Sequence, residues 1–247
     1  MRRPHRRVAI VTGAARGIGR ACAERLGADG FAIAALDREP IRWRAARGRV
    51  RRAYGCDIQD AAQVRRAVRA ILADFGRIDV LVNNAGVYRE VPVERTARAD
   101  IDHVLGVNVI GTITMTAACV GALKKSKGAI VNISSALSSR PYPTISLYVA
   151  AKGAIEAYTR ALAVELAPAG VRANAVLPGL IKTDMFKTVG YDDAFIAAEI
   201  AKWSKLYPLG RVGEPDDIAA AVAYLASPKA AWMTGAMWPV EGGKLVA

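Results

Sequence analysis

The chain has 247 residues, of which 53% are hydrophobic and 23% charged, a globular composition that excludes disorder as the main state. This length suits one α/β domain, and the formal net charge of +13 raises the question of a nucleic-acid partner. No uninterrupted apolar run reaches the roughly 18 residues of a membrane span, so we expect no membrane association.

The first half of the chain alternates short apolar runs with helical patterns. A glycine-rich turn joins the first strand to the first helix, and Asp37 and Asp57 close the second and third strands. The arginine-rich residues 38–49 predict at best a short helix. The predicted strands are 8–12, 31–36, 50–56 and 80–82, and the predicted helices are 17–28 and 60–75.

The second half continues this alternation with two long helices, and a mixed segment at 180–209 precedes the last helix. The predicted helices are 96–125, 147–166 and 215–226, and the predicted strands are 129–134, 171–177 and 236–240. Strands that alternate with helices favour a parallel sheet covered on both faces. We therefore predict a doubly wound, mostly parallel, seven-stranded Rossmann-type α/β fold, formed by a single domain over residues 1–247.

The glycine-rich turn after the first strand is a candidate phosphate-binding site. Gly13, Gly17 and Gly19 let backbone amides approach a pyrophosphate, which would then lie at the positive end of the following helix. Asp37 follows Gly19 by eighteen residues and could accept hydrogen bonds from ribose hydroxyls. The alternative is that Asp37 caps the next helix, and Asp57 has the same two interpretations.

Tyr148 and Lys152 are four residues apart on a predicted helix and share one of its faces. The phenol of a tyrosine has an ordinary pKa of about 10 and exchanges protons poorly near neutral pH. An adjacent ammonium group favours the phenolate and lowers that pKa. We therefore interpret Tyr148 as a general acid/base whose pKa is lowered by Lys152.

The chain resembles the short-chain dehydrogenase/reductase family over essentially its whole length. The residues that carry the resemblance stand in order at family spacing: Gly13, Gly17 and Gly19 after Thr12, Asn83 to Gly86, Asn108, Ser135, Tyr148 with Lys152, and Pro178 and Gly179 with Thr183. The resemblance implies an oxidoreductase that transfers a hydride between a nicotinamide cofactor and a secondary alcohol or ketone. No metal is implied.

The resemblance assigns roles to four catalytic residues. Ser135 polarises the substrate oxygen, Tyr148 passes the proton, Lys152 holds the nicotinamide ribose, and Asn108 kinks the long helix and holds a water molecule. It also implies that Asn84 lies in the turn under the cofactor, that Asp57 lies at the adenine and that Thr183 meets the carboxamide. The other implied cofactor contacts are Arg16, Ile18, Ile58, Ala85, Gly86, Pro178, Gly179 and Ile181.

The choice between NAD and NADP rests on conflicting residues. Arg16 and Arg38 are of the kind that clamp the 2′-phosphate of NADP in relatives, whereas the Asp37 carboxylate would repel that phosphate. We expect Asp37 to decide in favour of NAD. The resemblance also implies a homotetramer, in which the helices 96–125 and 147–166 pair across one axis, and the helix 215–226 with the last strand forms a second interface.

The substrate is a small alcohol or ketone whose identity stays open among oxoacyl thioesters, sugars or polyols, and cyclic alcohols. Its pocket is expected from residues 86–95, 136–147 and 180–209, the last as a mobile lid. Arg89 and Arg140 could hold an anionic substrate group there, although solvated arginines are the favoured interpretation. The expected lining also includes Leu137, Tyr142, Leu180, Met185 and Phe186, with Trp203 in the lid or in packing.

A rival hypothesis is a nucleotide-sensing binding protein whose basic patch contacts nucleic acid or an acidic partner. The patch consists of Arg38, Arg42, Arg44, Arg47, Arg49, Arg51 and Arg52. We expect a solvated face there, or one that steers an anionic cofactor inward, since no nucleic-acid-binding motif accompanies the charge. Nucleic acid is therefore not an expected partner.

Cysteine and histidine usage points to a reducing compartment without a metal centre. Cys22, Cys56 and Cys119 are scattered without a CxxC spacing, which predicts neither a disulfide framework nor a zinc site. His5 and His103 are too far apart for a histidine-based metal site. A cytoplasmic location fits these observations best.

Overall fold

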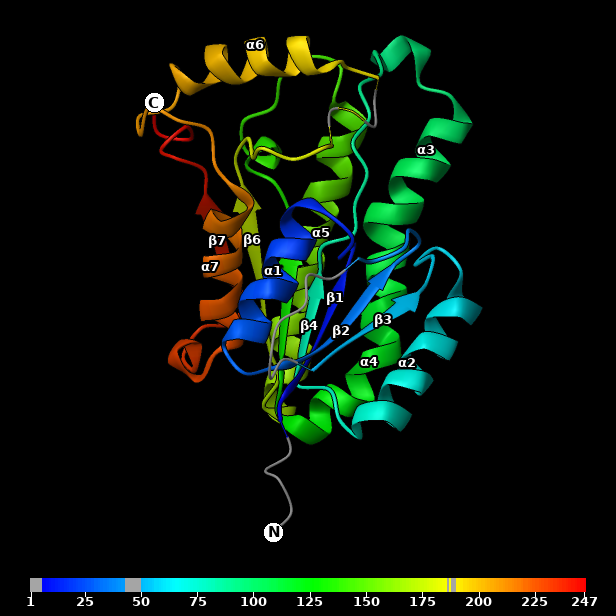
Figure 1. The fold of residues 1–247 in the computed structure, drawn as a ribbon. Helices are drawn as coiled ribbons and strands as arrows, with labels where there is room; N and C mark the ends of the chain where they lie inside the picture. Colours follow the sequence, from blue (N-terminus) through cyan, green and yellow to red (C-terminus); the bar gives the residue numbers. More distant parts are fainter. Residues whose placement is uncertain (1–5, 43–49, 186, 188–189) are drawn as a thin grey trace.

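A parallel sheet organises the computed structural model, which describes residues 6–42, 50–185, 187 and 190–247. Within these residues seven strands follow the order β3-β2-β1-β4-β5-β6-β7, and all neighbours are parallel (Figure 1). This confirms the predicted Rossmann-type fold. The strands are β1 (Val8–Thr12), β2 (Ala32–Asp37), β3 (Arg51–Gly55), β4 (Val80–Asn83), β5 (Ala129–Ile133), β6 (Arg172–Pro178) and β7 (Met237–Val240).

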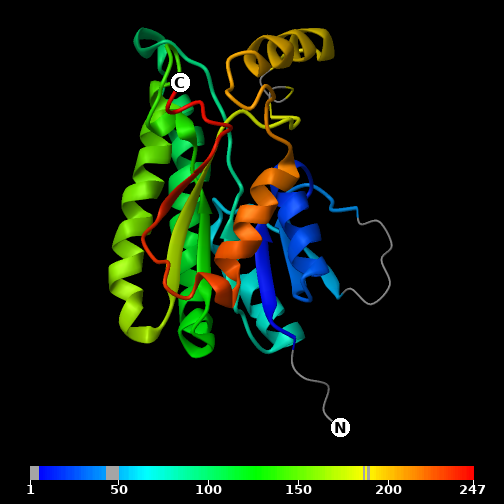
Figure 2. The same ribbon diagram turned by 90° about the vertical axis from the view of Figure 1, so that its left-hand side faces the viewer.

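Helices cover both faces of the sheet. Figures 1 and 2 show α1 (Gly17–Ala28) and α7 (Pro215–Ala226) on one face, and α2 (Ala61–Phe75), α4 (Thr112–Ser126) and α5 (Ser146–Leu166) on the other. Side chains therefore alternate between two hydrophobic cores along each central strand. Ile10, Leu81 and Ile130 face the α2, α4 and α5 side, whereas Val11, Val82 and Val131 face α1 and α7.

The strand order places a ligand-binding crevice at one edge of the sheet. The chain proceeds from β1 outward to β2 and β3, and then returns to β4 on the other side of β1. At such a switch point the loops after neighbouring strands diverge to opposite faces, which leaves a crevice at the carboxyl ends of the strands. The residues that follow β1, β2, β4, β5 and β6 meet at this edge.

The predicted helix 96–125 is one continuous segment with an internal irregularity. It consists of α3 (Arg98–Leu105), a π-helical segment η2 (Gly106–Gly111) and α4. The segment Arg98–Ser126 is long and apolar enough to cross a membrane by length and composition alone. It packs instead against α2 and β4, and a core helix of a globular protein meets the same criteria.

Two predictions for irregular segments are revised. The segment 180–209, expected to be mixed, contains a regular helix, α6 (Asp193–Ser204), which the Asp192 carboxylate caps by accepting a hydrogen bond from the Phe195 amide at 2.7 Å. Residues 38–42 are not helical, so a helix cap by Asp37 finds no helix in the described part. Arg44, Arg47, Arg49, Phe186 and His5 lie outside the described residues.

Candidate functional site

A cavity of about 960 Å³ opens at the carboxyl edge of the sheet. It extends from the glycine-rich turn after β1 to the start of α5, and α6 forms its outer wall (Figure 1). Nearly all predicted site residues line it: Gly13, Arg16, Gly17, Ile18, Asp37, Asp57, Ile58, Asn84, Ala85, Gly86, Asn108, Ser135, Tyr148, Lys152, Pro178, Gly179, Ile181 and Thr183. Gly19 is the exception, because it lies beneath the turn.

The glycine-rich turn has the shape of a phosphate cradle. Gly13 has a φ of +64°, and a Cβ atom there would lie 2.9 Å from the Cα of Ala85. A Cβ on Gly19 would lie 2.1 Å from the Gly13 carbonyl oxygen, so only glycine lets the first turn of α1 approach this loop. The helix N-terminus that results can face a pyrophosphate. A dinucleotide fits these residues.

A side-chain clamp fastens this turn to β4. The Asn84 amide nitrogen donates hydrogen bonds to the carbonyl oxygens of Thr12, at 2.9 Å, and Gly13, at 3.2 Å. In the other direction, the Thr12 hydroxyl accepts hydrogen bonds from the backbone amides of Asn84 and Ala85, both at 3.0 Å. The sequence prediction did not include this role of Thr12. Its position could have indicated it, because a polar side chain at the end of a buried strand needs a hydrogen-bond partner.

Asp37 lies at the end of β2 and is held by the backbone. Its carboxylate accepts hydrogen bonds from the amides of Ala15, at 2.9 Å, and Glu39, at 3.0 Å. The Arg16 guanidinium forms an ion pair with Glu39 at 2.9 Å. Sequence analysis missed Glu39. With it, the side chains of Asp37, Glu39, Arg16 and Arg38 line this end of the cavity, and Arg16 is engaged by Glu39.

Asp57 and Ile58 line the same end of the cavity after β3. The Asp57 carboxylate accepts a hydrogen bond from the Gln59 amide, at 2.9 Å, and Ile58 is buried. The N-cap of α2 is Asp60, whose carboxylate accepts hydrogen bonds from the amides of Ala62 and Gln63. The interpretation of Asp57 as the helix cap is therefore wrong. Asp57 remains a residue of the cavity wall.

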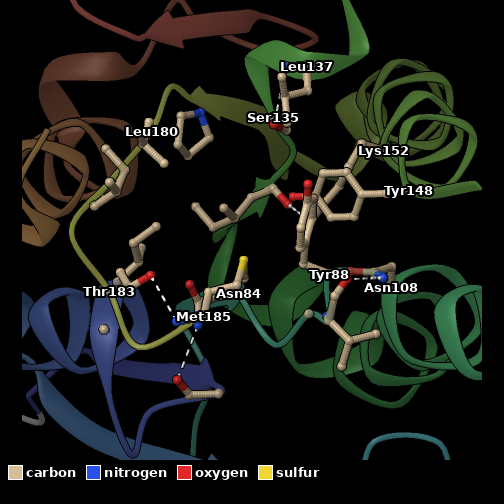
Figure 3. A pocket seen from close by; sticks show the side chains of 18 of the residues that line it. Asn84, Tyr88, Asn108, Ser135, Leu137, Tyr148, Lys152, Leu180, Thr183 and Met185 are labelled. Carbon is tan, nitrogen blue, oxygen red and sulfur yellow. Dashed lines mark hydrogen bonds between the residues drawn. The ribbon is translucent and has the colours of Figure 1, made fainter. Parts of the chain in front are cut away.

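Ser135, Tyr148 and Lys152 meet at the other end of the cavity (Figure 3). All three side chains are buried, Ser135 two residues after the end of β5 and the other two on the first turns of α5. The Lys152 ammonium group donates a hydrogen bond to the Ile133 carbonyl oxygen at 2.9 Å and lies 5.6 Å from the centre of the Tyr148 ring. The sequence prediction that these groups share one site is thus supported by their geometry.

The pKa values in this cluster differ from the expectation. Burial raises the pKa of Tyr148 to about 12, although a hydrogen bond with Ser135 acts in the opposite direction. Burial also lowers the pKa of Lys152 to about 8. The expected lowering of the Tyr148 pKa by Lys152 is not found, because desolvation is the largest effect at both groups.

Asn108 lies in the π-helical segment η2 and turns toward the site. Its amide nitrogen donates hydrogen bonds to the carbonyl oxygens of Val104 and Val87, both at 2.9 Å. A π-helical turn inserts one extra residue into a helix and often marks a functional position. A Cβ on Gly86 would lie 2.8 Å from the Asn108 side-chain oxygen and 3.5 Å from the Lys152 nitrogen, so these three residues are close neighbours.

The loop after β6 closes the cavity from the opposite side, where Figure 3 shows Leu180, Thr183 and Met185. The Gly179 amide donates a hydrogen bond to Val240, and a Cβ on Gly17 would lie 3.2 Å from the Thr183 side chain. Pro178 and Ile181 also line this wall. Thr183 therefore lies against the glycine-rich turn.

The two candidate anion-binding arginines are engaged with other groups. Arg89 forms an ion pair with Asp100 at 2.9 Å, and Arg140 donates hydrogen bonds to the carbonyl oxygens of Lys244, at 2.5 Å, and Ala247. This favours the interpretation that they are not substrate ligands. The sequence prediction did not include Glu90, which also lines the cavity.

Comparisons with known proteins agree with this geometry. The family model described as enoyl-(acyl carrier protein) reductase matches residues 13–244. The chain is 40% identical to the short-chain reductase protein NovJ of Streptomyces niveus, covering 96% of this chain and 93% of that protein.

Two solved structures have the same fold. One is the aldohexose dehydrogenase of Thermoplasma acidophilum, with a TM-score of 0.90 and 32% identity over 98% of this chain and 95% of that one. The other is the 3-ketoacyl-(acyl-carrier-protein) reductase of Brucella melitensis in complex with NADH, with a TM-score of 0.87 and 33% identity over 97% of this chain and 98% of that one.

The close approach at Gly19 can be tested by substitution. We expect Gly19→Ala to weaken NAD binding at least about tenfold, or roughly 1.4 kcal/mol, because the added Cβ displaces the turn that faces the pyrophosphate. Isothermal titration calorimetry measures the affinity, and circular dichroism verifies the fold. Gly55→Ala is the control, since a Cβ at this strand end meets nothing within 4 Å. Undiminished affinity in a folded Gly19→Ala protein would contradict the cradle.

Proposed function

Because the chain belongs to the short-chain dehydrogenase/reductase family, whose members transfer a hydride between a nicotinamide cofactor and an alcohol or ketone, we propose that Tyr148 is its general acid/base. The observation that carries this proposal is the burial of Ser135, Tyr148 and Lys152 together in a cavity that also contains the glycine-rich turn. The rival hypothesis of a nucleic-acid-binding sensor has no support in the comparisons.

Each catalytic side chain has a separate task in this proposal. The Ser135 hydroxyl donates a hydrogen bond to the substrate oxygen, and Tyr148 accepts the hydroxyl proton in oxidation or donates it in reduction. Lys152 holds the nicotinamide ribose, and its charge stabilises the Tyr148 phenolate when the proton has left. Asn108 positions the water that continues the proton relay. The nicotinamide, when bound, accepts or donates the hydride.

Substitution of the phenol tests this assignment. We expect Tyr148→Phe to lower kcat by about a hundredfold to ten-thousandfold while the Kd for NAD changes little, because only the proton transfer is lost. The measurement is nicotinamide absorbance with a panel of secondary alcohols and ketones, together with calorimetry for the Kd. Lys152→Ala is the contrasting variant and should lower both kcat and the affinity for NAD. Near-normal turnover by Tyr148→Phe would refute the assignment.

The same proton transfer predicts opposite pH profiles for the two directions. Oxidation requires the phenolate, and its fraction grows as the pH rises toward the Tyr148 pKa of about 12. The kcat/KM for oxidation should therefore rise steadily above neutral pH, whereas that for reduction, which uses the neutral phenol, should stay level and fall only as the pH approaches about 12. The Tyr148→Phe protein should lose this dependence on pH in its residual activity.

We propose NAD as the preferred cofactor. The Asp37 carboxylate lies at the end of β2, where the adenosine ribose binds in this fold, and a 2′-phosphate there would meet its negative charge. Glu39 adds a second carboxylate and engages Arg16, one of the two arginines suited to the phosphate, whereas Arg38 is exposed. Two like charges in a partly desolvated site repel strongly.

The cofactor preference has a direct kinetic test. We expect the kcat/KM ratio of NAD to NADP to be at least about tenfold, or roughly 1.4 kcal/mol. Asp37→Ala should shrink or reverse this ratio, and Glu39→Gln should shift it the same way because Arg16 is released. Arg98→Ala, which removes an exposed arginine on α3, is the control. A preference of the unmodified enzyme for NADP would refute the proposal.

We also propose a cytoplasmic homotetramer, with each chain folded as one domain and residues 180–209 acting as a mobile lid. Exposed apolar side chains on the long helices support an interface there, namely Ile110, Ile113 and Val164. Trp232 is fully exposed beside α7 and supports a second interface. The three cysteines are free and buried, which supports a reducing compartment.

Light scattering tests the assembly. We expect the mass of four chains at micromolar concentration, and Val164→Glu should reduce this mass because it places a charge in an apolar interface. Arg69→Glu, at an exposed position of α2 outside both proposed interfaces, makes a similar change of charge and should leave the mass unchanged. A monomer of the unmodified protein would contradict the proposed assembly.

A further inference from the structure

A single carboxylate, that of Glu90, lies at the centre of a group of phenols in the substrate half of the cavity. Its Oε1 atom accepts hydrogen bonds from the hydroxyls of Tyr88, at 2.5 Å, and Tyr142, at 3.4 Å. Its Oε2 atom accepts one from Tyr191 at 2.9 Å. The Tyr88 and Tyr142 hydroxyls also contact each other. These residues come from three separate segments, after β4, after β5 and before α6.

This group borders the reacting atoms directly. The Tyr88 ring packs edge-to-face against the ring of Tyr148, with 5.1 Å between their centres, and Figure 3 shows the two side by side. Tyr88, Glu90, Tyr142 and Tyr191 all line the cavity. Tyr88 therefore links Glu90 to Tyr148, because its ring contacts Tyr148 and its hydroxyl donates to Glu90.

The negative charge of Glu90 lacks a cationic partner among the described residues. Among the basic residues of the cavity wall, Arg89 pairs with Asp100, Lys202 pairs with Glu199, and Lys152 donates to a backbone carbonyl. Burial and the hydrogen bond to Glu90 raise the pKa of Tyr88 well above its ordinary value, and the pKa values of Tyr142 and Tyr191 are raised as well. The phenols therefore stay neutral and leave one negative charge.

Aromatic rings surround this charge. Tyr142 lies 6.4 Å from Trp203, measured between ring centres, and Tyr191 stacks on Phe195 at 4.3 Å. Aromatic faces attract cations, and a carboxylate within a group of aromatic rings combines this attraction with direct charge complementarity. A neutral hydroxyl gains much less from such surroundings, and an anionic group is repelled.

We propose that the Glu90 group, formed by Glu90, Tyr88, Tyr142 and Tyr191, binds a positively charged ammonium group of the substrate, so that the enzyme acts on amino alcohols or aminoketones. The inference rests on the proposed function, because it places the ammonium on the same molecule as the reacting carbon. The ammonium replaces none of the catalytic groups. It donates hydrogen bonds to the carboxylate and phenol oxygens and fixes the orientation of the substrate.

Matched substrates test the inference by kinetics. One series consists of secondary alcohols that carry a terminal ammonium group one to three carbons beyond the carbinol carbon. The other replaces that ammonium by a methyl group. We expect kcat/KM to favour at least one ammonium compound over its alkyl analogue by about tenfold or more, mainly through a lower KM. If no ammonium compound is preferred over its alkyl analogue at any chain length, the proposal is overturned.

Two variants distinguish charge recognition from a merely structural role of Glu90. Glu90→Gln keeps the size of the side chain and should reduce the preference for the ammonium compound at least about tenfold. Glu199→Gln is the matched control: Glu199 lines the same cavity, but Lys202 at 3.1 Å already neutralises it, so the preference should change little. If Glu90→Gln lowers kcat/KM equally for both series, Glu90 only fastens the segments together and the proposal fails.

A binding measurement separates this proposal from the reaction itself. Ligand-observed NMR with butylammonium and with butanol, on the protein saturated with NAD, needs no turnover. We expect butylammonium to bind more tightly than butanol to the unmodified protein, and this difference to disappear in Glu90→Gln. Equal binding of both probes overturns the ammonium subsite. Selective binding without turnover of any alcohol or ketone in the panel would instead place the error in the proposed function.

Discussion

The buried ammonium group of Lys152 is the constraint on which the catalytic end depends. Placing a charge in the interior is costly unless it has hydrogen-bond partners, and the carbonyl of Ile133 at the end of β5 supplies one. This bond fixes the first turns of α5 relative to the sheet and therefore places Tyr148 beside Ser135. The narrow gap to Gly86 and Asn108 follows from the same arrangement, since a larger residue at position 86 would contact both side chains.

The cofactor end depends on a different contact and is joined to the first through β4. Asn84 and Thr12 exchange hydrogen bonds across the carboxyl ends of β1 and β4. Three residues farther on, the backbone of Val87 bonds with Asn108, which belongs to the catalytic end. A short stretch of chain after β4 thus positions both ends of the cavity, and a shift in it would misplace the phosphate cradle and the catalytic group together.

Much of this architecture could be predicted from the sequence because local patterns determine it. The strand Val8–Thr12 and the helix Gly17–Ala28 agree with their predicted bounds, since a buried apolar run and a glycine turn mark them clearly. The helix Asp193–Ser204 was missed, because it has no buried residues and hence a weak periodic pattern. Long-range partners such as Glu39 for Arg16 are equally invisible, since a salt bridge across 23 residues leaves no local pattern.

Burial was the largest effect that sequence spacing could not supply. The four-residue separation of Tyr148 and Lys152 predicted a shared face and, by proximity, a lowered phenol pKa. The structure confirms the shared face, but desolvation raises the pKa of Tyr148 and lowers that of Lys152. Spacing in the sequence shows which groups are near each other. The burial of a site depends on every element packed around it, and here burial decides the sign of the Tyr148 pKa shift.

The net charge of +13 and the acidic groups in the cavity act over different distances. A net charge acts through solvent, where salt screens it beyond about 8–10 Å, so it assists the approach of an anionic dinucleotide without selecting among ligands. Selection occurs at contact, where the half-buried carboxylates of Asp37 and Glu90 line the cavity and are screened less than charges on the surface. A strongly basic chain can therefore attract an anionic cofactor to one end of its cavity and still prefer a cationic substrate group at the other.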